Sequence, residues 1–284
     1  MRQRELGTRT VGAVGLGAMP LSAGGRPDED RALATVAAAL EAGVTLIDTA
    51  DAYALGHDDF GHGEVLIGRL LDRLGTARED VVVATKAGHV RTADDGWDLD
   101  GRPEYLIRAA EASARRLGVE AIDLHQFHRP DPKVPYAESL GALAELLERG
   151  VIRAAGISNA DAERIRLARD VLGDGFVAVQ NELSPRFRSS EDEARLCEEL
   201  GLAFVAWSPL GGMTNARALG AEHAAFAVVA AERGVSPQRV CLAWLLAKSP
   251  AVIPIPGSTR PETIRDSAAA ADLSLTEAEL ARLG

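Results

Sequence analysis

The sequence of 284 residues is poor in aromatic side chains, which make up 4% of it, and it contains only two cysteines. It has no run of eighteen or more apolar residues, and no signal-peptide core follows residues 1–5, so neither a transmembrane helix nor a secretory leader is expected. Cys197 and Cys241 lack a C-x-x-C spacing. We therefore expect two structural thiols in a reduced, cytoplasmic protein.

Basic residues are also in deficit, because the formal net charge is -11. A surface that binds nucleic acid or an anionic membrane needs a basic face, so neither partner is expected. An anionic ligand would have to be held by local positive charge or by helix N-termini. The hydrophobic content of 46% is enough for a large core, which Ala, Leu, Val and Ile must fill.

Short apolar segments alternate with helical segments along the chain. After a small hairpin at residues 5–12, the pattern predicts a first strand at 14–19 and seven more that end near Asp48, Lys86, His128, Ser158, Asn181, Ser208 and Ile255. The expected helices cover residues 28–42, 64–74, 103–117, 136–149, 160–172, 191–200, 222–233, 237–247, a segment from Pro261 onward, and 276–283. This order predicts an α/β protein: a single (β/α)₈ TIM barrel domain over residues 1–284 with an N-terminal hairpin and extra helices.

Three consecutive predicted strands carry ionisable residues at their ends. One strand ends at Asp48 with Tyr53 in the next loop, the second ends at Lys86, and the third ends at His128. The C-terminal ends of barrel strands meet at one rim, so these four side chains are expected to lie together. Each alone is more often a solvated group or a turn cap. Together they suggest a proton donor: the ammonium lowers the pKa of the phenol, the carboxylate holds the ammonium, and His128 orients a carbonyl oxygen.

Eight short segments match a known pattern in order and spacing, and the resemblance that they carry covers nearly the whole chain. They are Gly15–Met19, Asp48–Tyr53, Ala84–Lys86, Asp123–Pro130, Gly156–Asn159, Val179–Glu182, Ala206–Leu210 and Ile255–Ser258. With them the sequence resembles the aldo-keto reductases, and most closely the short-tailed bacterial members, some of which reduce pyridoxal or simple aldehydes. The resemblance implies a catalytic tetrad of Asp48, Tyr53 (the acid), Lys86 and His128, with hydride from NAD(P)H.

The same resemblance implies the cofactor contacts, with NADPH preferred and NADH possible. Ser158, Asn159 and Gln180 would hold the nicotinamide carboxamide, which needs both donors and acceptors. The other expected contacts are Gly17, Ala18, Met19, Trp207, Ser208, Leu210, Gly211, Gly257, Ser258, Thr259, Arg260, Asp266 and Ser267. Arg260, just before the helix from Pro261, is the main candidate for the adenosine 2′-phosphate, because Thr263 and Asp266-Ser267 depart from the residues common in the family.

The substrate is expected to be a small aldehyde or ketone in an open pocket, with Trp97 and Phe60 as walls, and the protein a monomer or small homo-oligomer. Two other classes stay open: a cofactor-binding regulatory protein with little turnover, and a metal-dependent barrel hydrolase. The hydrolase is disfavoured and no metal is expected, because His125 and His128 are three apart on a strand and point to opposite faces.

Overall fold

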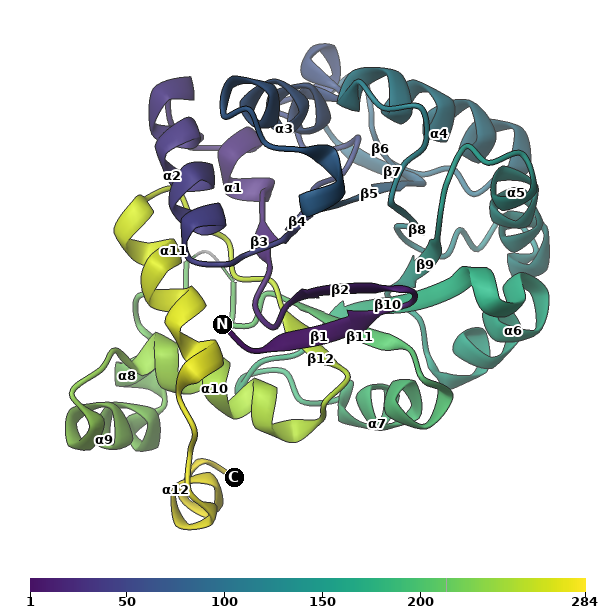
Figure 1. The fold of residues 1–284 in the computed structure, drawn as a ribbon. Helices are drawn as coiled ribbons and strands as arrows, with labels where there is room; N and C mark the ends of the chain where they lie inside the picture. Colours follow the sequence, from purple (N-terminus) through teal and green to yellow (C-terminus); the bar gives the residue numbers. More distant parts are fainter. Residues whose placement is uncertain (213) are drawn as a thin grey trace.

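The computed structural model describes residues 1–212 and 214–284, and these form a parallel barrel surrounded by helices (Figure 1). The barrel strands are β3 (Leu16–Gly17), β4 (Leu46–Asp48), β5 (Val82–Ala87), β8 (Leu124–Phe127), β9 (Ala155–Ser158), β10 (Phe176–Glu182), β11 (Ala203–Trp207) and β12 (Val252–Pro254). Each pairs with the next in that order. A parallel bridge between Gly17 and Gly257 joins the first strand to the segment after the last. The predicted (β/α)₈ fold is confirmed.

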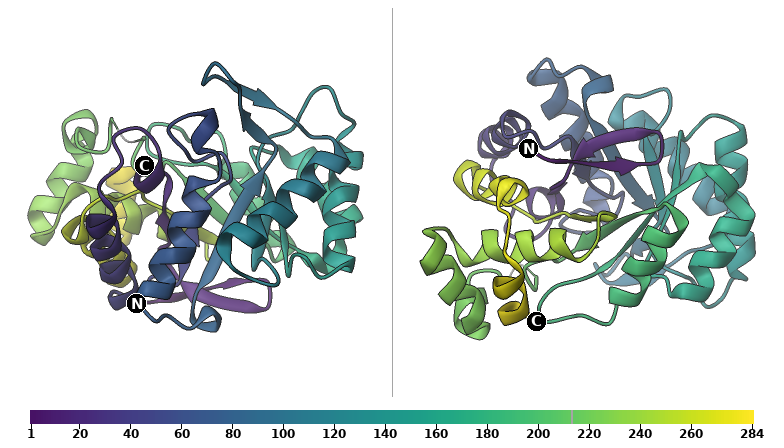
Figure 2. Two further views of the ribbon diagram at one scale, coloured as in Figure 1. Left: turned by 90° about the horizontal axis from the view of Figure 1, so that it is seen from above. Right: turned by 60° about the horizontal axis from the view of Figure 1, so that its bottom comes forward.

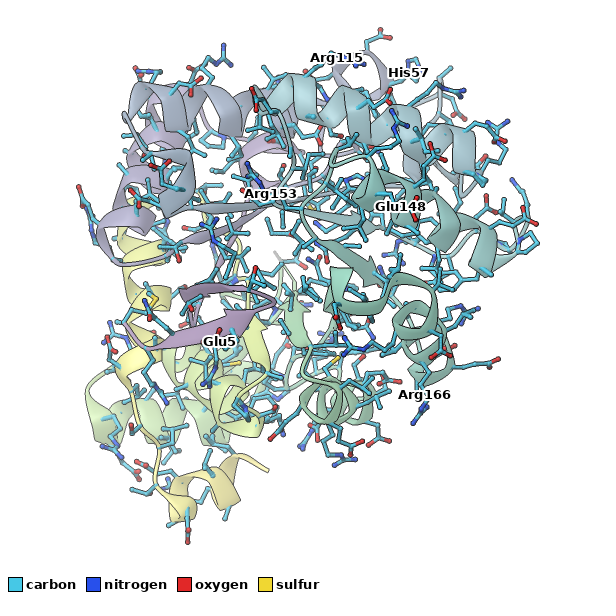
Figure 3. The ribbon with its side chains drawn as sticks, turned by 45° about the vertical axis from the view of Figure 1, so that its right-hand side comes forward. Glu5, His57, Arg115, Glu148, Arg153 and Arg166 are labelled. Atoms are coloured by element: carbon cyan, nitrogen blue, oxygen red, sulfur yellow. The ribbon has the colours of Figure 1, made fainter. Side chains whose placement is uncertain are left out.

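The helices cover the outside of the barrel. They are α1 (Met19–Ser22), α2 (Glu29–Glu41), α3 (His62–Arg73), α4 (Pro103–Leu117), α5 (Tyr136–Glu148), α6 (Ala162–Leu172), α7 (Glu191–Leu200), α8 (Leu219–Glu222), α9 (Ala224–Arg233), α10 (Pro237–Lys248), α11 (Pro261–Ala268) and α12 (Glu277–Leu283), with 3₁₀ turns η1 (His57–Asp59), η2 (Arg78–Asp80), η3 (Gly173–Gly175) and η4 (Ala269–Asp272). Their charged side chains point to solvent, as Arg115, Glu148 and Arg166 show in Figure 3. In the described part of the chain no helix is long and apolar enough to cross a membrane.

Two antiparallel hairpins stand at opposite ends of the barrel (Figure 2, left). The first, β1 (Gln3–Leu6) with β2 (Arg9–Gly12), lies across one opening, and its Leu6 and Val11 pack on the barrel interior. The second, β6 (His89–Arg91) with β7 (Trp97–Leu99), rises from the other end. Only the first was predicted; the second lies in the segment expected to be a long loop.

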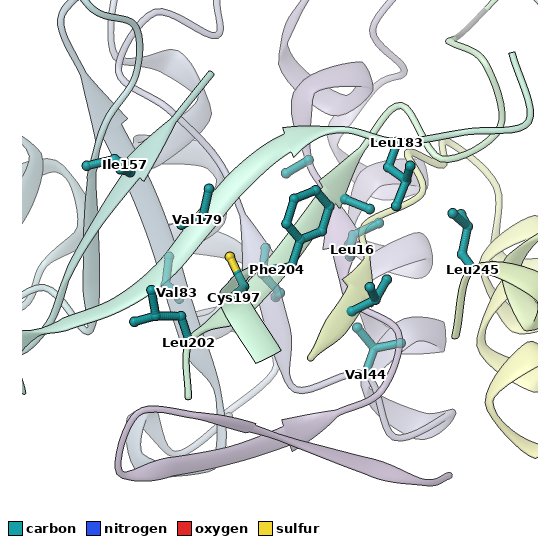
Figure 4. Close-up of a cluster of buried hydrophobic side chains, with 14 of the residues drawn as sticks. Leu16, Val44, Val83, Ile157, Val179, Leu183, Cys197, Leu202, Phe204 and Leu245 are labelled. Atoms are coloured by element: carbon teal, nitrogen blue, oxygen red, sulfur yellow. The ribbon is translucent and has the colours of Figure 1, made fainter. Parts of the chain in front are cut away.

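The two-residue period of a strand divides the core into an inner and an outer cluster. On β5, Val82 and Ala84 face the barrel interior, whereas Val83 packs between the barrel and its helices. Figure 4 shows part of this outer cluster, which also contains Val179 and Phe204.

The same alternation decides which polar residues reach the rim from inside. Leu46 on β4 and Leu124 on β8 belong to the inner cluster. Asp48 follows Leu46 by two residues, and Gln126 follows Leu124 by two. Lys86 likewise follows Ala84 by two. All three side chains therefore occupy the layer directly above the inner core.

Candidate active site

Lys86 lies at the centre of the polar layer and is fully buried. Its Nζ donates to Asp48 Oδ1 at 2.6 Å, to the carbonyl oxygen of Thr49 at 2.7 Å and to the hydroxyl of Tyr53 at 3.3 Å. Three acceptors satisfy the three protons of the ammonium. The buried charge is therefore paired and hydrogen-bonded, as a charge in a barrel interior must be.

The second oxygen of Asp48 is held by two amides. Asp48 Oδ2 accepts from Nε2 of Gln180 at 2.8 Å and from Nε2 of Gln126 at 3.3 Å. Strands β4, β8 and β10 thus converge on one carboxylate. The orientation of Asp48, and with it that of Lys86, is fixed from both sides.

The pKa of Tyr53 is raised, so the expected net lowering by Lys86 is wrong. Burial of the phenol outweighs the charge of Lys86, which acts in the lowering direction. For Lys86 burial acts to lower the pKa, but the charges of Asp48 and Tyr53 prevail and raise it. The phenol is therefore protonated and the ammonium charged over the neutral pH range.

His128 lies beside Tyr53. Its ring lies 6.0 Å from the ring of Tyr53, edge to face, and 5.1 Å from the ring of His89. Burial, followed by the charge of Lys86, holds the pKa of His128 well below its usual value. The imidazole is therefore neutral and has one N–H to donate.

A cluster of acidic residues supports the loop that carries Tyr53. Glu64 on α3 is buried, accepts from Oγ1 of Thr85 at 2.6 Å and pairs with Nε of Arg116 at 2.5 Å. Asp51 is also buried, and burial together with the charge of Glu64 raises its pKa well above the ordinary value. Glu64 and Asp51 lie on either side of Tyr53 in the chain, so the cluster fixes the phenol's loop to the outer face of β5.

Asp48, Tyr53 and His128 border a cavity of about 360 Å³ at the rim. Of the residues predicted for the site, the cavity lining contains Gly17, Met19, Asp48, Tyr53, Trp97, His128, Ser158, Asn159, Gln180, Trp207, Ser208, Leu210 and Gly257. Lys86 lies directly beneath it. Residues as far apart as 240 positions in the sequence, Gly17 and Gly257, therefore line the same cavity.

Two predicted residues in this lining have unusual backbone geometry. Asn159 and Ser208 have φ angles of 58° and 48°, and they are two of three non-glycine residues with positive φ in the described chain. Such conformations are costly and often occur at ligand sites. The amide of Asn159 also donates to the carbonyl of His128 at 3.0 Å, while the hydroxyl of Ser158 donates to the carbonyl of Gln180 at 2.7 Å.

The remaining predicted residues lie beside the cavity or away from it. Ala18 and Gly211 adjoin lining residues in the chain, and Ser258, Thr259 and Arg260 form the turn before α11. The Arg260 guanidinium is half exposed and pairs with Glu262 at 3.5 Å. In the same helix Ser267 is buried and Asp266 is bound by Arg239 and Ser236. Phe60 follows η1 and does not belong to the cavity lining.

Three residues at the site were not identified from the sequence. Gln126 binds Asp48, and His89 and Arg129 line the cavity. Gln126 is two residues before His128 on the same strand, so the strand period was a usable signal. His89 reaches the cavity only through the unpredicted hairpin. Its ring stacks on Trp97 at 4.3 Å.

His125 faces the helical layer, as the strand period predicted, and it is fully buried. Neither of its ring nitrogens has a hydrogen-bond partner among the described residues. The described residues also contain no group of three or more His, Cys, Asp or Glu side chains placed to hold a metal ion.

Comparison with known proteins agrees with this fold. The model of the aldo/keto reductase family matches residues 13–284, so the chain belongs to the aldo/keto reductase family. Among curated proteins it is 31% identical to an uncharacterized oxidoreductase of Schizosaccharomyces pombe, over 98% of this chain and 88% of that protein.

Solved structures give the same family. A thermostable aldo-keto reductase in complex with the inhibitor epalrestat is 29% identical, with a TM-score of 0.83 over 100% of this chain and 98% of that one. An aldo/keto reductase from Klebsiella pneumoniae in complex with NADP and acetate is 28% identical, with a TM-score of 0.82 over 99% and 93%. The glycerol dehydrogenase of Gluconobacter oxydans is 28% identical, with a TM-score of 0.84 over 99% and 93%.

Proposed function

We propose that this protein is an NADPH-dependent reductase that converts small aldehydes or ketones to alcohols, with Tyr53 as the proton donor. The observation that carries the proposal is the buried contact of Lys86 with both Asp48 and Tyr53 beside a rim cavity. Bound nicotinamide would supply the hydride to the carbonyl carbon. The protein would supply the proton for the carbonyl oxygen.

The residues at the cavity fit a nicotinamide. The side-chain donors of Ser158, Asn159 and Gln180 are engaged within the protein, which leaves the amide oxygens of Asn159 and Gln180 to accept from the N–H groups of a carboxamide. The indole of Trp207 borders the same space, and its Nε1 is buried without a partner among the described residues. The Klebsiella pneumoniae relative bound to NADP adds support for this cofactor.

The geometry gives each of the four side chains a role. Tyr53 remains protonated near neutral pH and donates its proton as negative charge develops on the carbonyl oxygen. Lys86 stabilises the phenolate that results, and Asp48 keeps Lys86 charged and in place. His128, which is neutral, donates a hydrogen bond to the same oxygen and so orients the substrate.

Arg260 is proposed to select NADPH over NADH. It is the N-cap residue of α11, and Pro261 and Glu262 follow it. Backbone N–H groups and an exposed guanidinium at a helix N-terminus suit a phosphate. The ion pair with Glu262 is weak at 3.5 Å and would open when a phosphate binds.

The test is the consumption of NADPH and of NADH, followed by absorbance, with a panel of aromatic and aliphatic aldehydes, pyridoxal and small ketones. Turnover with NADPH is expected. Tight NADPH binding without turnover of any panel member, measured by titration, would instead favour a regulatory cofactor-binding protein. Absence of both turnover and cofactor binding would overturn the proposal.

A further inference from the structure

The cavity lining also contains an arginine and two stacked rings. Arg129 follows His128 in the chain, and His89 and Trp97 come from the β6–β7 hairpin. All three line the cavity that holds Tyr53 and His128. None of them takes part in the hydrogen bonds that hold Lys86.

Arg129 is partly buried and has no ion-pair partner among the described residues. Within the described chain no hydrogen bond or ion pair involves its guanidinium, and no carboxylate lies within 4.0 Å of it. Arg129 interacts electrostatically with Glu182. Burial raises the pKa of the Glu182 carboxyl, and the positive charge of Arg129 acts in the lowering direction. This carboxylate is outside the cavity lining, so it does not occupy the position that a ligand would take.

The other ionisable groups of the lining leave the charge of Arg129 uncompensated. Asp48 is neutralised by its ion pair with Lys86. Burial and the charges of Arg129 and Arg91 lower the pKa of His89 to about 4, so this ring is neutral near pH 7. Among the described ionisable side chains that line the cavity, none therefore neutralises the charge of Arg129.

A second arginine near the cavity, Arg91 of the β6–β7 hairpin, already has partners within the protein. The Arg91 guanidinium stacks over Trp97 at 4.3 Å, and its Nη2 donates to the carbonyl of Leu55 at 2.8 Å. It fixes the hairpin and, through it, the indole, whose side chain is 49% exposed. The N–H groups of the Arg129 guanidinium thus remain available to bind a ligand, and their planar arrangement matches a carboxylate.

We propose that Arg129, with the side chains of Trp97 and His89, forms a subsite for the carboxylate of the substrate, so that the preferred substrates are small oxo acids. This inference rests on the proposed reductase function and specifies its substrate class. The carbonyl lies at Tyr53 and His128, the carboxylate accepts a forked pair of hydrogen bonds from Arg129, and the carbon skeleton between them packs on the Trp97–His89 stack.

The experiment compares two substrates that differ only in charge, 4-carboxybenzaldehyde and its methyl ester, with saturating NADPH. For the unaltered protein we expect a kcat/KM at least 10-fold higher for the acid, falling as ionic strength rises. Arg129→Met should lower the ratio of acid to ester at least 10-fold, and Arg129→Lys should restore part of it. A structural defect would lower both rates together and leave the ratio unchanged.

Arg102→Met is the matched control, because it removes an exposed guanidinium that pairs with Asp100 and does not line the cavity. It should change the acid-to-ester ratio less than twofold. An equal loss in both variants, or an unaltered protein that prefers the ester, would overturn the inference while leaving the reductase function intact.

The reductase function is decided by the wider panel of carbonyl compounds, so if neither of these two aldehydes is turned over the subsite is judged from binding alone. The subsite is then tested by the dissociation constant of terephthalate against that of its dimethyl ester, read from tryptophan fluorescence of the NADPH complex. Tighter binding of the dianion that is lost in Arg129→Met supports the subsite, and equal binding refutes it.

Discussion

Asp48 divides its two carboxylate oxygens between a cation and an amide: Oδ1 accepts from Lys86 at 2.6 Å and Oδ2 accepts from Gln180 at 2.8 Å. Gln180 is also one of the residues proposed to hold the nicotinamide. Its Nε2 is committed to Asp48, which leaves its carbonyl oxygen for the cofactor. The amide thus links the proton-donating group to the cofactor wall.

Replacing Tyr53 by Phe removes the proposed proton donor and little else. We expect kcat to fall by about 10²- to 10⁴-fold, the usual contribution of a positioned acid. The dissociation constant of NADPH, measured by fluorescence titration, should change less than twofold. Tyr136→Phe is the control, because its hydroxyl is buried without a partner among the described residues. Full activity in Tyr53→Phe would contradict the assignment.

Replacing Lys86 by Met leaves Asp48 charged and uncompensated in the barrel. Because both side chains are almost completely buried, the free energy of unfolding should fall by about 3–5 kcal/mol. The double variant Asp48→Asn/Lys86→Met removes both charges and should regain part of that loss, as measured by urea unfolding. Neither variant should reduce a carbonyl. A single variant within 1 kcal/mol of the original protein would contradict this account of the pair.

Replacing His125 by Leu tests the effect of a buried imidazole on acid stability. Burial lowers the pKa of His125 to about 4, whereas the unfolded residue titrates near 6.5. The folded protein therefore binds fewer protons, and stability that is complete above pH 6.5 is lost as the pH falls towards 4. Linkage gives about 2 kcal/mol between pH 7.5 and pH 5.

Urea unfolding at these two pH values should show that His125→Leu loses less stability on acidification than the unaltered protein does. His57→Leu controls for removal of a histidine, because His57 is exposed. Identical pH dependence in His125→Leu and the unaltered protein would show that the imidazole accepts a proton without cost in the fold.

Replacing Arg260 by Ala should weaken NADPH binding about 10-fold, the worth of one charge-assisted hydrogen bond. Binding of NADH, which lacks the 2′-phosphate, should change less than twofold. Arg265→Ala lies in the same helix and pairs with Glu41 on the surface, so it controls for loss of a charge. Equal losses for both cofactors would contradict a role in phosphate recognition.

The fold and the four central residues could be predicted because local signals carry them. Helix α4 has the predicted bounds: Pro103 occupies its first turn and Gly118 ends it at φ 68°. The two-residue alternation along a strand accounts for the side chains of Asp48, Lys86 and His128 pointing to the inside of the barrel. The partnership of Asp48 with Gln180 could not be predicted from local sequence, since it joins residues 132 positions apart.

Other features depend on packing that no local pattern specifies. The direction of the Tyr53 pKa depends on how completely the phenol is buried, and burial outweighs the neighbouring ammonium. The β6–β7 hairpin has strands of three residues each, too short for an alternating pattern to stand out. His89 and Arg129 were missed because their positions depend on that hairpin and on the loop after β8.

The bridge between Gly17 and Gly257 is the seam of the barrel, and both residues border the cavity. A Cβ atom on Gly17 would lie 2.7 Å from the carbonyl oxygen of Ile255, so the seam is tightly closed. During synthesis the first strand leaves the ribosome some 240 residues before its partner segment does. A nascent chain therefore has no complete rim cavity, and capture of the proposed cofactor must wait until almost the whole polypeptide has emerged.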